Sequence, residues 1–220
     1  MFPPCATQPP PRRFSRKMAE RLVIATRNAH KVSEIREILG TEFAVEDLSS
    51  IPDAPEVEET GATFEDNALL KALAISKCCD AWVAADDSGL EVDALGGAPG
   101  VYSARFSGPG ATDASNRTLL LEKLSGIRGK ARSARFRCAI ALARSGEKHA
   151  VFHGAVEGVI VNSEKGVGGF GYDSLFVPEG YCETFAELDA AVKNSLSHRA
   201  RALAGLRSWP GWRRGFSAGL

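Results

Sequence analysis

Apolar residues recur along this chain with two different periods, and the alternation of these periods constrains the fold more than any other feature of the sequence. Residues 22–25, 43–48 and 82–85 are short runs that resemble strands. Residues 28–39 and a longer segment that begins at Thr63 carry apolar residues at helical spacing. Strands that alternate with helices predict an α/β fold.

Capping residues mark where these helices begin and end. Asn28 can cap the first helix and Gly40 can end it. Thr63, with Asp66 three residues later, resembles a capping box at the start of the second helix. The apolar stripe of that helix comprises Phe64, Ala68, Ala72, Ile75 and Cys79.

The second half of the chain is richer in strands. Residues 112–124 have the pattern of a helix that ends before Gly126, and residues 134–142 alternate as a half-buried strand does. Residues 149–161 resemble a strand in which Gly154 and Gly158 mark bulges. A last helix ends near Pro210. These segments predict a mixed central β-sheet flanked by helices.

The charge of the chain is zero overall but is unevenly distributed. The 220 residues include 27 basic and 27 acidic side chains. Residues 1–17 contain five prolines and four basic residues but no acidic one, which predicts a disordered extension over residues 1–18; translation from Met18 is an alternative. We expect one domain over residues 19–208 and a C-terminal tail over residues 209–220.

Composition also argues against several classes of partner. Overall neutrality argues against a protein that coats nucleic acid or binds membranes through a polybasic surface. No apolar run approaches the ~18–20 residues that cross a bilayer. The five cysteines form no CxxC pair and no secretory signal is recognisable, which favours free thiols in a reducing compartment. We expect a cytoplasmic protein that binds neither nucleic acid nor a membrane.

Residues 25–31 lie between a predicted strand and a predicted helix and could bind an anion. Amide groups at a helix N-terminus attract phosphate, and hydroxyl, amide and ammonium donors accompany them at Thr26, Asn28 and Lys31. The glycines of a Walker loop or a dinucleotide-binding turn are absent. The alternative is an ordinary capped helix with a solvated Lys31.

Two groups of acidic residues could hold a metal. Glu58 and Glu59 precede the helix that begins at Thr63, and Asn67 and Lys71 share one face of that helix. Asp86 and Asp87 directly follow a predicted strand, and neighbours in an extended segment point to opposite faces. Carboxylates suit Mg²⁺, which takes one or two of them together with waters and substrate phosphates. An acidic turn without metal is the alternative.

A glycine-rich segment with aromatic side chains could bind a planar ligand. Residues 168–173 read GGFGYD, in which the glycines allow close approach of the backbone and Phe170 offers a stacking face. Lys193, His198 and Arg199 follow, and the last two supply donors for a base that carries a carbonyl group.

Six ordered motifs resemble the inosine/xanthosine triphosphate pyrophosphatase family. They are ATRNAHK at 25–31, ETGATF at 59–64, DDSGL at 86–90, GGAPGVYSAR at 96–105, GGFGYD at 168–173 and LSHR at 196–199. The resemblance extends from about Arg21 to Leu206. Arg27 is a departure, because the family often has glycine there.

The resemblance implies a mixed sheet in two lobes, with the active site in the cleft between them and a homodimer as the assembly. It implies Mg²⁺-dependent hydrolysis of ITP, dITP and XTP to the monophosphate and pyrophosphate. Asp87 would be the general base and a Mg²⁺ ligand with Glu59, and Glu58 and Asp86 are alternative ligands. The residues expected to bind the purine nucleoside triphosphate are Thr26, Arg27, Asn28, Ala29, His30, Lys31, Lys71, Ser88, Phe170, Gly171, Tyr172, Asp173, Lys193, His198 and Arg199.

Two other functions remain open from the sequence. One is a related pyrophosphatase that acts on pyrimidine or modified nucleotides. The other is a binding module without catalysis, for which the last 22 residues offer five arginines and no acidic residue. Turnover that depends on a metal separates an enzyme from a binding module.

Overall fold

The computed structural model describes residues 19–213. The extension predicted over residues 1–18, the alternative start at Met18 and residues 214–220 of the predicted tail lie outside the described residues. None of the described helices is long and apolar enough to cross a membrane.

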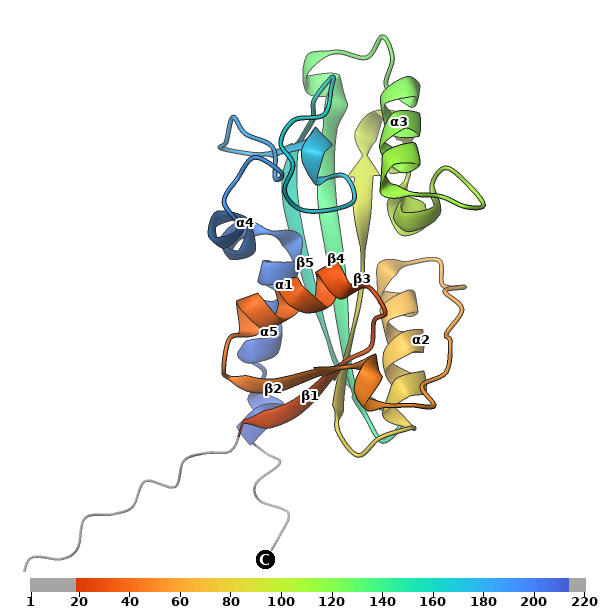
Figure 1. The fold of residues 1–220 in the computed structure, drawn as a ribbon, viewed down its shortest axis with the longest axis vertical. Helices are drawn as coiled ribbons and strands as arrows, with labels where there is room; N and C mark the ends of the chain where they lie inside the picture. Colours follow the sequence, from red (N-terminus) through yellow and green to blue (C-terminus); the bar gives the residue numbers. More distant parts are fainter. Residues whose placement is uncertain (1–18, 214–220) are drawn as a thin grey trace, which may run out of the picture.

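One mixed sheet of six strands organises the described chain, in the order β2-β1-β3-β4-β5-β6 (Figure 1). Strands β2, β1 and β3 run parallel, and the remaining neighbours pair antiparallel. The predicted α/β class and mixed sheet are therefore confirmed. The strands are β1 (Glu20–Ile24), β2 (Phe43–Asp47), β3 (Trp82–Val92), β4 (Ser133–Arg144), β5 (Glu147–Ile160) and β6 (Phe176–Pro178).

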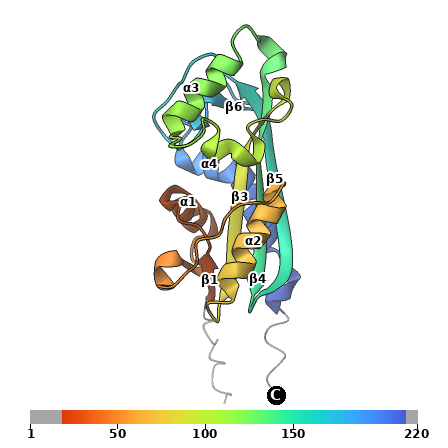
Figure 2. The same ribbon diagram turned by 90° about the vertical axis from the view of Figure 1, so that its right-hand side faces the viewer.

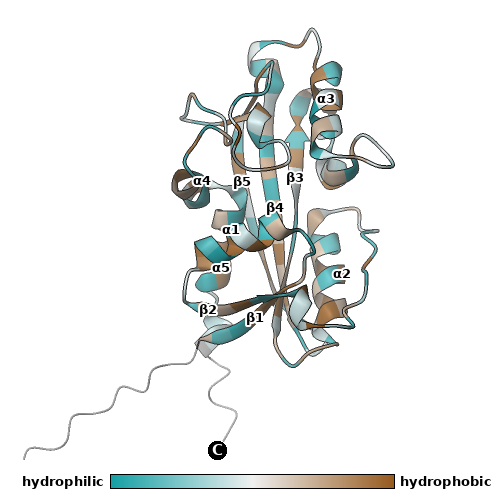
Figure 3. Cartoon of the chain, in the orientation of Figure 1, coloured by the Kyte–Doolittle hydropathy of each residue, from teal (hydrophilic) through white to brown (hydrophobic). Residues whose placement is uncertain are grey.

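Five α-helices pack around this sheet, and three apolar clusters form its core. One cluster lies under α1 and α5, a second lies under α2, and a third joins α3 to the far ends of β3, β4 and β5. In Figure 3 both α1 and α2 carry hydrophilic and hydrophobic residues, as amphipathic helices do. The helices are α1 (Ala29–Leu39), α2 (Phe64–Ser76), α3 (Asp113–Lys123), α4 (Ala190–Leu196) and α5 (His198–Arg207).

The long strands β3, β4 and β5 run through two lobes. Figures 1 and 2 show β1, β2, α1, α2 and α5 around one end of these strands, and α3, α4 and β6 around the other. We call these ends the first and second lobe. The three strands pair along most of their length, with Val83 to Val92 of β3 facing Ala143 to Ala134 of β4.

The predicted helix caps are confirmed. The Asn28 side chain accepts hydrogen bonds from the first turn of α1, and Gly40 ends that helix. Thr63 and Asp66 form a capping box at the start of α2. That helix ends at Ser76, so Cys79 lies beyond it and packs against the same core from the following turn.

The strand predicted over residues 82–85 is too short. β3 continues through Asp86 and Asp87 to Val92, so both carboxylates stand within a buried strand and not after it. The prediction was wrong because an isolated buried charge is costly. Here cations from other elements pair with both carboxylates.

The glycines of β5 do not form the bulges that the sequence predicts. The irregularity in pairing falls between Leu142 and Ala143 of β4. A Cβ atom on Gly154 would lie 2.0 Å from the carbonyl oxygen of His198 and 2.7 Å from the amide nitrogen of Ala202. Gly154 therefore lets the backbone of α5 lie directly on β5, at the turn that carries His198.

This close approach yields a stability prediction for Gly154→Ala. We expect the variant to lose about 1–3 kcal/mol of unfolding free energy, because the added methyl group overlaps backbone atoms that cannot move independently. Thermal unfolding followed by circular dichroism measures the loss. Gly205→Ala is the control, because the three atoms nearest to the added Cβ all belong to the Phe152 side chain, the first of them 3.1 Å away, and alanine favours a helix. Equal melting temperatures for the Gly154 variant and the wild type would contradict the role of this contact.

The first residues of the predicted tail belong to the fold. Trp209 and Trp212 pack against the core under α5, and Trp212 contacts Phe43 and Trp82 with ring centroids 5.1 and 5.2 Å apart. The boundary predicted after residue 208 therefore falls inside packed structure.

Candidate active site

A cavity of about 340 Å³ opens beside the middle of β3 and is lined by both lobes. Its volume is in the range of small-molecule sites. Of the residues singled out in the sequence, Ala29, His30, Glu58, Asn67 and Asp86 do not line it. Those that do are Thr26, Arg27, Asn28, Lys31, Glu59, Lys71, Asp87, Ser88, Phe170, Gly171, Tyr172, Asp173, Lys193, His198 and Arg199.

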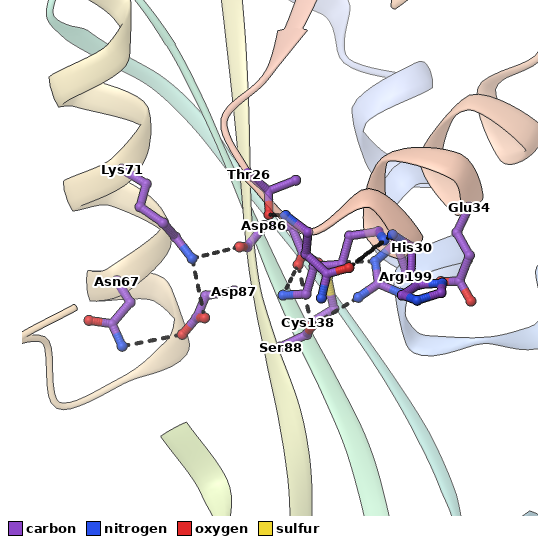
Figure 4. A network of polar contacts seen from close by, with 12 residues as sticks. Thr26, His30, Glu34, Asn67, Lys71, Asp86, Asp87, Ser88, Cys138 and Arg199 are labelled. Carbon is purple, nitrogen blue, oxygen red and sulfur yellow. Dashed lines mark hydrogen bonds and ion pairs between the residues drawn. The ribbon is translucent and has the colours of Figure 1, made fainter. Parts of the chain in front are cut away.

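Adjacent aspartates on β3 point to opposite faces of the sheet, as the strand period requires (Figure 4). Asp87 faces α2, and Asp86 faces α1 and α5. The two carboxylates therefore have different partners although they are neighbours in sequence.

The Asp87 carboxylate is held by two donors from α2. Nδ2 of Asn67 lies 3.2 Å from one oxygen and Nζ of Lys71 lies 3.3 Å from the other. Lys71 also donates to Glu59 at 2.7 Å. Burial raises the pKa of Asp87 and outweighs the opposing effect of Lys71. The site thus contains a carboxylate that is fixed in position and more basic than usual.

The Asp86 carboxylate is fully buried among cations. Its side chain is 1% exposed and forms ion pairs with Lys31 and, at 3.2 Å, with Nε of Arg199. The Cys138 thiol donates to it at 3.0 Å. Burial alone would raise the pKa of Asp86, but Arg199 and Lys31 hold it well below the ordinary value. Asp86 is therefore ionised at neutral pH and balances the neighbouring cations.

Glu34 extends this charged group toward α4. It pairs with both Lys193 and Arg199, and Lys193 donates to Asp173 at 2.7 Å. Glu34 was not among the residues predicted from the sequence. Its position one turn after Lys31 on the same helix face could have indicated it.

In the segment over residues 25–31, which was expected to bind an anion, some of the polar groups already bind other groups of the protein. Oδ1 of Asn28 accepts the amide groups of His30 and Lys31 at 2.9 and 3.2 Å. The Lys31 side chain is mostly buried, and its ammonium group pairs with Asp86. Arg27, in the position where the resemblance leads one to expect glycine, donates to the carbonyl oxygen of Ala54 at 3.1 Å and still lines the cavity.

The glycines of the GGFGYD segment mainly make room for protein atoms. A Cβ atom on Gly169, which has φ +71°, would lie 2.2 Å from Oδ2 of Asp173. One on Gly168 would lie 3.0 Å from the carbonyl oxygen of Ala186. Of the glycines in this segment, only Gly171 lines the cavity. The expectation that these glycines admit a planar ligand thus holds for at most one of them.

His198 is a neutral imidazole in the cavity wall. Burial, followed by the nearby Arg199 charge, lowers its pKa well below the ordinary value. Its ring stacks on Phe136 with the centroids 4.8 Å apart. Its Nδ1 atom is buried without a hydrogen-bond partner, which is costly unless a ligand supplies one.

Glu59 and Asp87 are the pair that could hold a divalent metal. Among residues 19–213 there is no group of three or more His, Cys, Asp or Glu side chains arranged around one point. Mg²⁺ needs only one or two carboxylates when substrate phosphates and waters complete its shell. Glu59 and Asp87 share the Lys71 ammonium group, so they fit this donor set. Glu58 is exposed, and Asp86 is already neutralised.

α3 contributes residues to the site that were not predicted from the sequence. Asp113 accepts the Gly171 amide at 2.7 Å, and Arg117 donates to the Gly171 carbonyl oxygen at 2.9 Å. Asp113 and Asn116 also line the cavity. These contacts are not local in sequence, so no motif around α3 indicates them.

Comparison with known proteins places this site in a family. The sequence model of the Ham1 family matches residues 22–209. The chain belongs to the Ham1 family. The matched residues include all of β3 and every residue that we have placed in the cavity wall.

Relatives within the Ham1 family are similar over nearly their whole length. A protein of Geobacter sulfurreducens named dITP/XTP pyrophosphatase is 51% identical over 193 residues, which cover 87% of this chain and 97% of the relative. A protein of Bacillus subtilis with the same name is 47% identical, over 82% of this chain and 92% of the relative.

Solved structures of the Ham1 family share the fold. A HAM1 protein from Coxiella burnetii is 39% identical with a TM-score of 0.76, over 85% of this chain and 96% of that one. A nucleoside-triphosphatase/dITP/XTP pyrophosphatase from Mycobacterium abscessus is 45% identical with a TM-score of 0.69, over 86% of this chain and 100% of that one.

Proposed function

We propose that this protein hydrolyses ITP, dITP and XTP to the monophosphate and pyrophosphate, and so removes non-standard purine nucleotides from the nucleotide pool. One observation carries the proposal. A single cavity is lined both by a fixed, basic carboxylate with a lysine beside it and by aromatic and cationic side chains suited to a purine. The names of the Ham1 relatives support the same substrates.

Asp87 is the general base in this proposal. Cleavage between the α and β phosphates needs a water molecule aimed at the α phosphorus and a group that takes its proton. Asn67 and Lys71 each hold one oxygen of the Asp87 carboxylate, so its orientation is set before substrate arrives. In the metal-free protein, burial raises the pKa of Asp87, which makes its carboxylate a better proton acceptor than a solvated one.

Charge at the phosphates is balanced by lysines and, in the proposal, by Mg²⁺ held by Glu59 and Asp87. Mg²⁺ would supply charge neutralisation on the phosphate oxygens. Lys71 lies beside both carboxylates, and Lys31 lies at the first turn of α1. A triphosphate that enters the cavity competes with Asp86 for Lys31, which couples phosphate binding to the buried charged group.

His198 and Arg199 select the base in this proposal. Neutral His198 has one ring N–H group to donate, and Arg199 has several. A donor directed at the purine 6-position pairs with the 6-oxo group of hypoxanthine or xanthine. It meets another donor in the 6-amino group of adenine, and burying two unpaired donors is strongly disfavoured.

We further propose that the protein is a cytoplasmic homodimer. The family resemblance supports the dimer, and the four described cysteines, all free thiols, support a reducing compartment. Light scattering of the purified protein measures the assembly. A monomer at all accessible concentrations would refute the dimer.

A panel of triphosphates tests the proposed function. We expect ITP, dITP and XTP to be hydrolysed with release of pyrophosphate, and ATP to be turned over at least about 100-fold less efficiently, because of the mismatch at the 6-position. Pyrophosphate detection with Mg²⁺, and again after EDTA treatment, measures both specificity and metal dependence. Preference for pyrimidine triphosphates would refute the substrate assignment, and full activity in EDTA would refute the metal.

A further inference from the structure

His30 was expected from the sequence to be one of the substrate-binding residues, and in the structure its side chain lies against another side chain of the protein. Its side chain is exposed, and it does not line the cavity. Its imidazole stacks on the ring of Phe170, with centroids 5.4 Å apart and planes inclined by 17°. This geometry is that of a favourable aromatic pair.

The two members of this pair are anchored very differently. The His30 amide donates to the Asn28 cap at 2.9 Å, at the start of a regular helix. Phe170 stands in an irregular loop between β5 and β6, with Gly169 and Gly171 on either side. The loop is attached near Phe170 by its amide, which donates to Asp173 at 2.9 Å. That bond fixes the backbone but leaves the ring to be positioned by its side-chain contacts.

Three side chains approach the Phe170 ring. His30 stacks on it, and Lys193 and Arg199 place their charged groups 5.1 and 5.8 Å from its centroid. Lys193 and Arg199 line the cavity and His30 does not, so the contact with His30 comes from outside the space that a ligand would fill. His30 is also the only aromatic side chain that contacts Phe170 within the described residues.

We propose that His30 is a positioning residue that holds Phe170 as the platform on which the purine base stacks. The contact joins the first lobe, where α1 carries the phosphate-binding lysine, to the second lobe, where the loop carries Phe170. The proposal rests on the proposed function, because it assigns Phe170 to a purine. His30 acts through its aromatic face and needs neither a charge nor a hydrogen bond.

The test compares His30→Ala with His30→Phe, which keeps an aromatic face and removes the ring nitrogens. We expect the alanine variant to raise KM for ITP about two- to tenfold, the effect of losing one aromatic pair, with kcat within about twofold of the wild type. The phenylalanine variant should restore KM. Inhibition by inorganic tripolyphosphate, which lacks a base, should be unchanged in both variants.

Other results would overturn the proposal. If both variants weaken inhibition by tripolyphosphate, His30 is a phosphate ligand. If the phenylalanine variant resembles the alanine variant, or if KM is unchanged in both, the ring stack does not position Phe170. In a Phe170→Ala background, His30→Ala should no longer raise KM, because the ring that His30 contacts is already absent.

Binding measured without metal separates this proposal from the proposed function. Calorimetric titration of ITP in EDTA gives the dissociation constant without turnover. A wild type that binds ITP but does not hydrolyse it with Mg²⁺ refutes the function, while the ratio of dissociation constants between the variants still tests His30. A wild type that neither binds ITP in EDTA nor hydrolyses it with Mg²⁺ overturns both.

Discussion

Asp87→Asn is expected to lower kcat for ITP by about 10²–10⁴-fold, the contribution typical of a general base. The amide cannot take a proton from water, although it can still accept the hydrogen bond from Asn67. The same substitution should leave stability unchanged or raise it. Burial raises the pKa of Asp87, so folding disfavours its charged form, and removing the charge removes that cost. Pyrophosphate release and thermal unfolding on the same sample measure both effects.

The pH dependence of the wild type should agree with this assignment. The base works only when it is ionised, so kcat should fall as pH decreases toward the pKa of Asp87, which burial raises above the ordinary 3.8 in the metal-free protein. Glu58→Gln is the control, because Glu58 is exposed and lies outside the cavity wall. The kcat of this variant should equal that of the wild type. An Asp87→Asn variant that keeps more than a tenth of wild-type turnover would remove Asp87 from the role of base.

Asp86→Asn, in contrast to Asp87→Asn, is expected to cause a large loss of stability. The Asp86 carboxylate is buried and balances Lys31 and Arg199, so the amide leaves two cations with too little negative charge around them. Breaking a buried ion pair costs about 3–5 kcal/mol. In a protein of this size that lowers the melting temperature by on the order of 10 °C. Urea unfolding followed by tryptophan fluorescence measures the free energy directly.

Acid titration of the wild type also measures how much the ionised Asp86 carboxylate contributes to stability. The folded-state pKa of Asp86 lies well below its ordinary value, so its contribution to stability is present above the unfolded pKa. It is lost only as pH falls through the folded pKa. The Asp86→Asn variant should lack this contribution already at neutral pH. If it unfolds at the same urea concentration as Asp87→Asn, which carries the identical change one residue away, the buried ion pairs are not stabilising.

Features that depend on neighbours in sequence could be predicted without the structure. The caps at Asn28 and Thr63 are local hydrogen bonds, and both lie where the sequence indicated them. The alternation of strands and helices led to the correct fold class. The six motifs led to the family, and most of the residues taken from them line one cavity.

Features that depend on distant pairing could not be predicted. The full length of β3 was missed because Asp86 and Asp87 resemble the end of a buried strand until their partners are known. Those partners include Arg199, more than a hundred residues away in sequence. The role of Gly154 was missed for the same reason, since the atoms that require a glycine there belong to α5.

The continuity of β3, β4 and β5 through both lobes has a mechanical consequence. Proteins that close over a ligand by swinging rigid domains do so about a few residues in a connecting segment. Here the connection is three paired strands, whose ladder of hydrogen bonds resists bending at any single residue. The paired strands therefore hold Asp87, the proposed general base, at a set distance from the part of the second lobe that carries the Phe170 loop. Any change of shape when the substrate binds is therefore expected in the loops and side chains around the cavity.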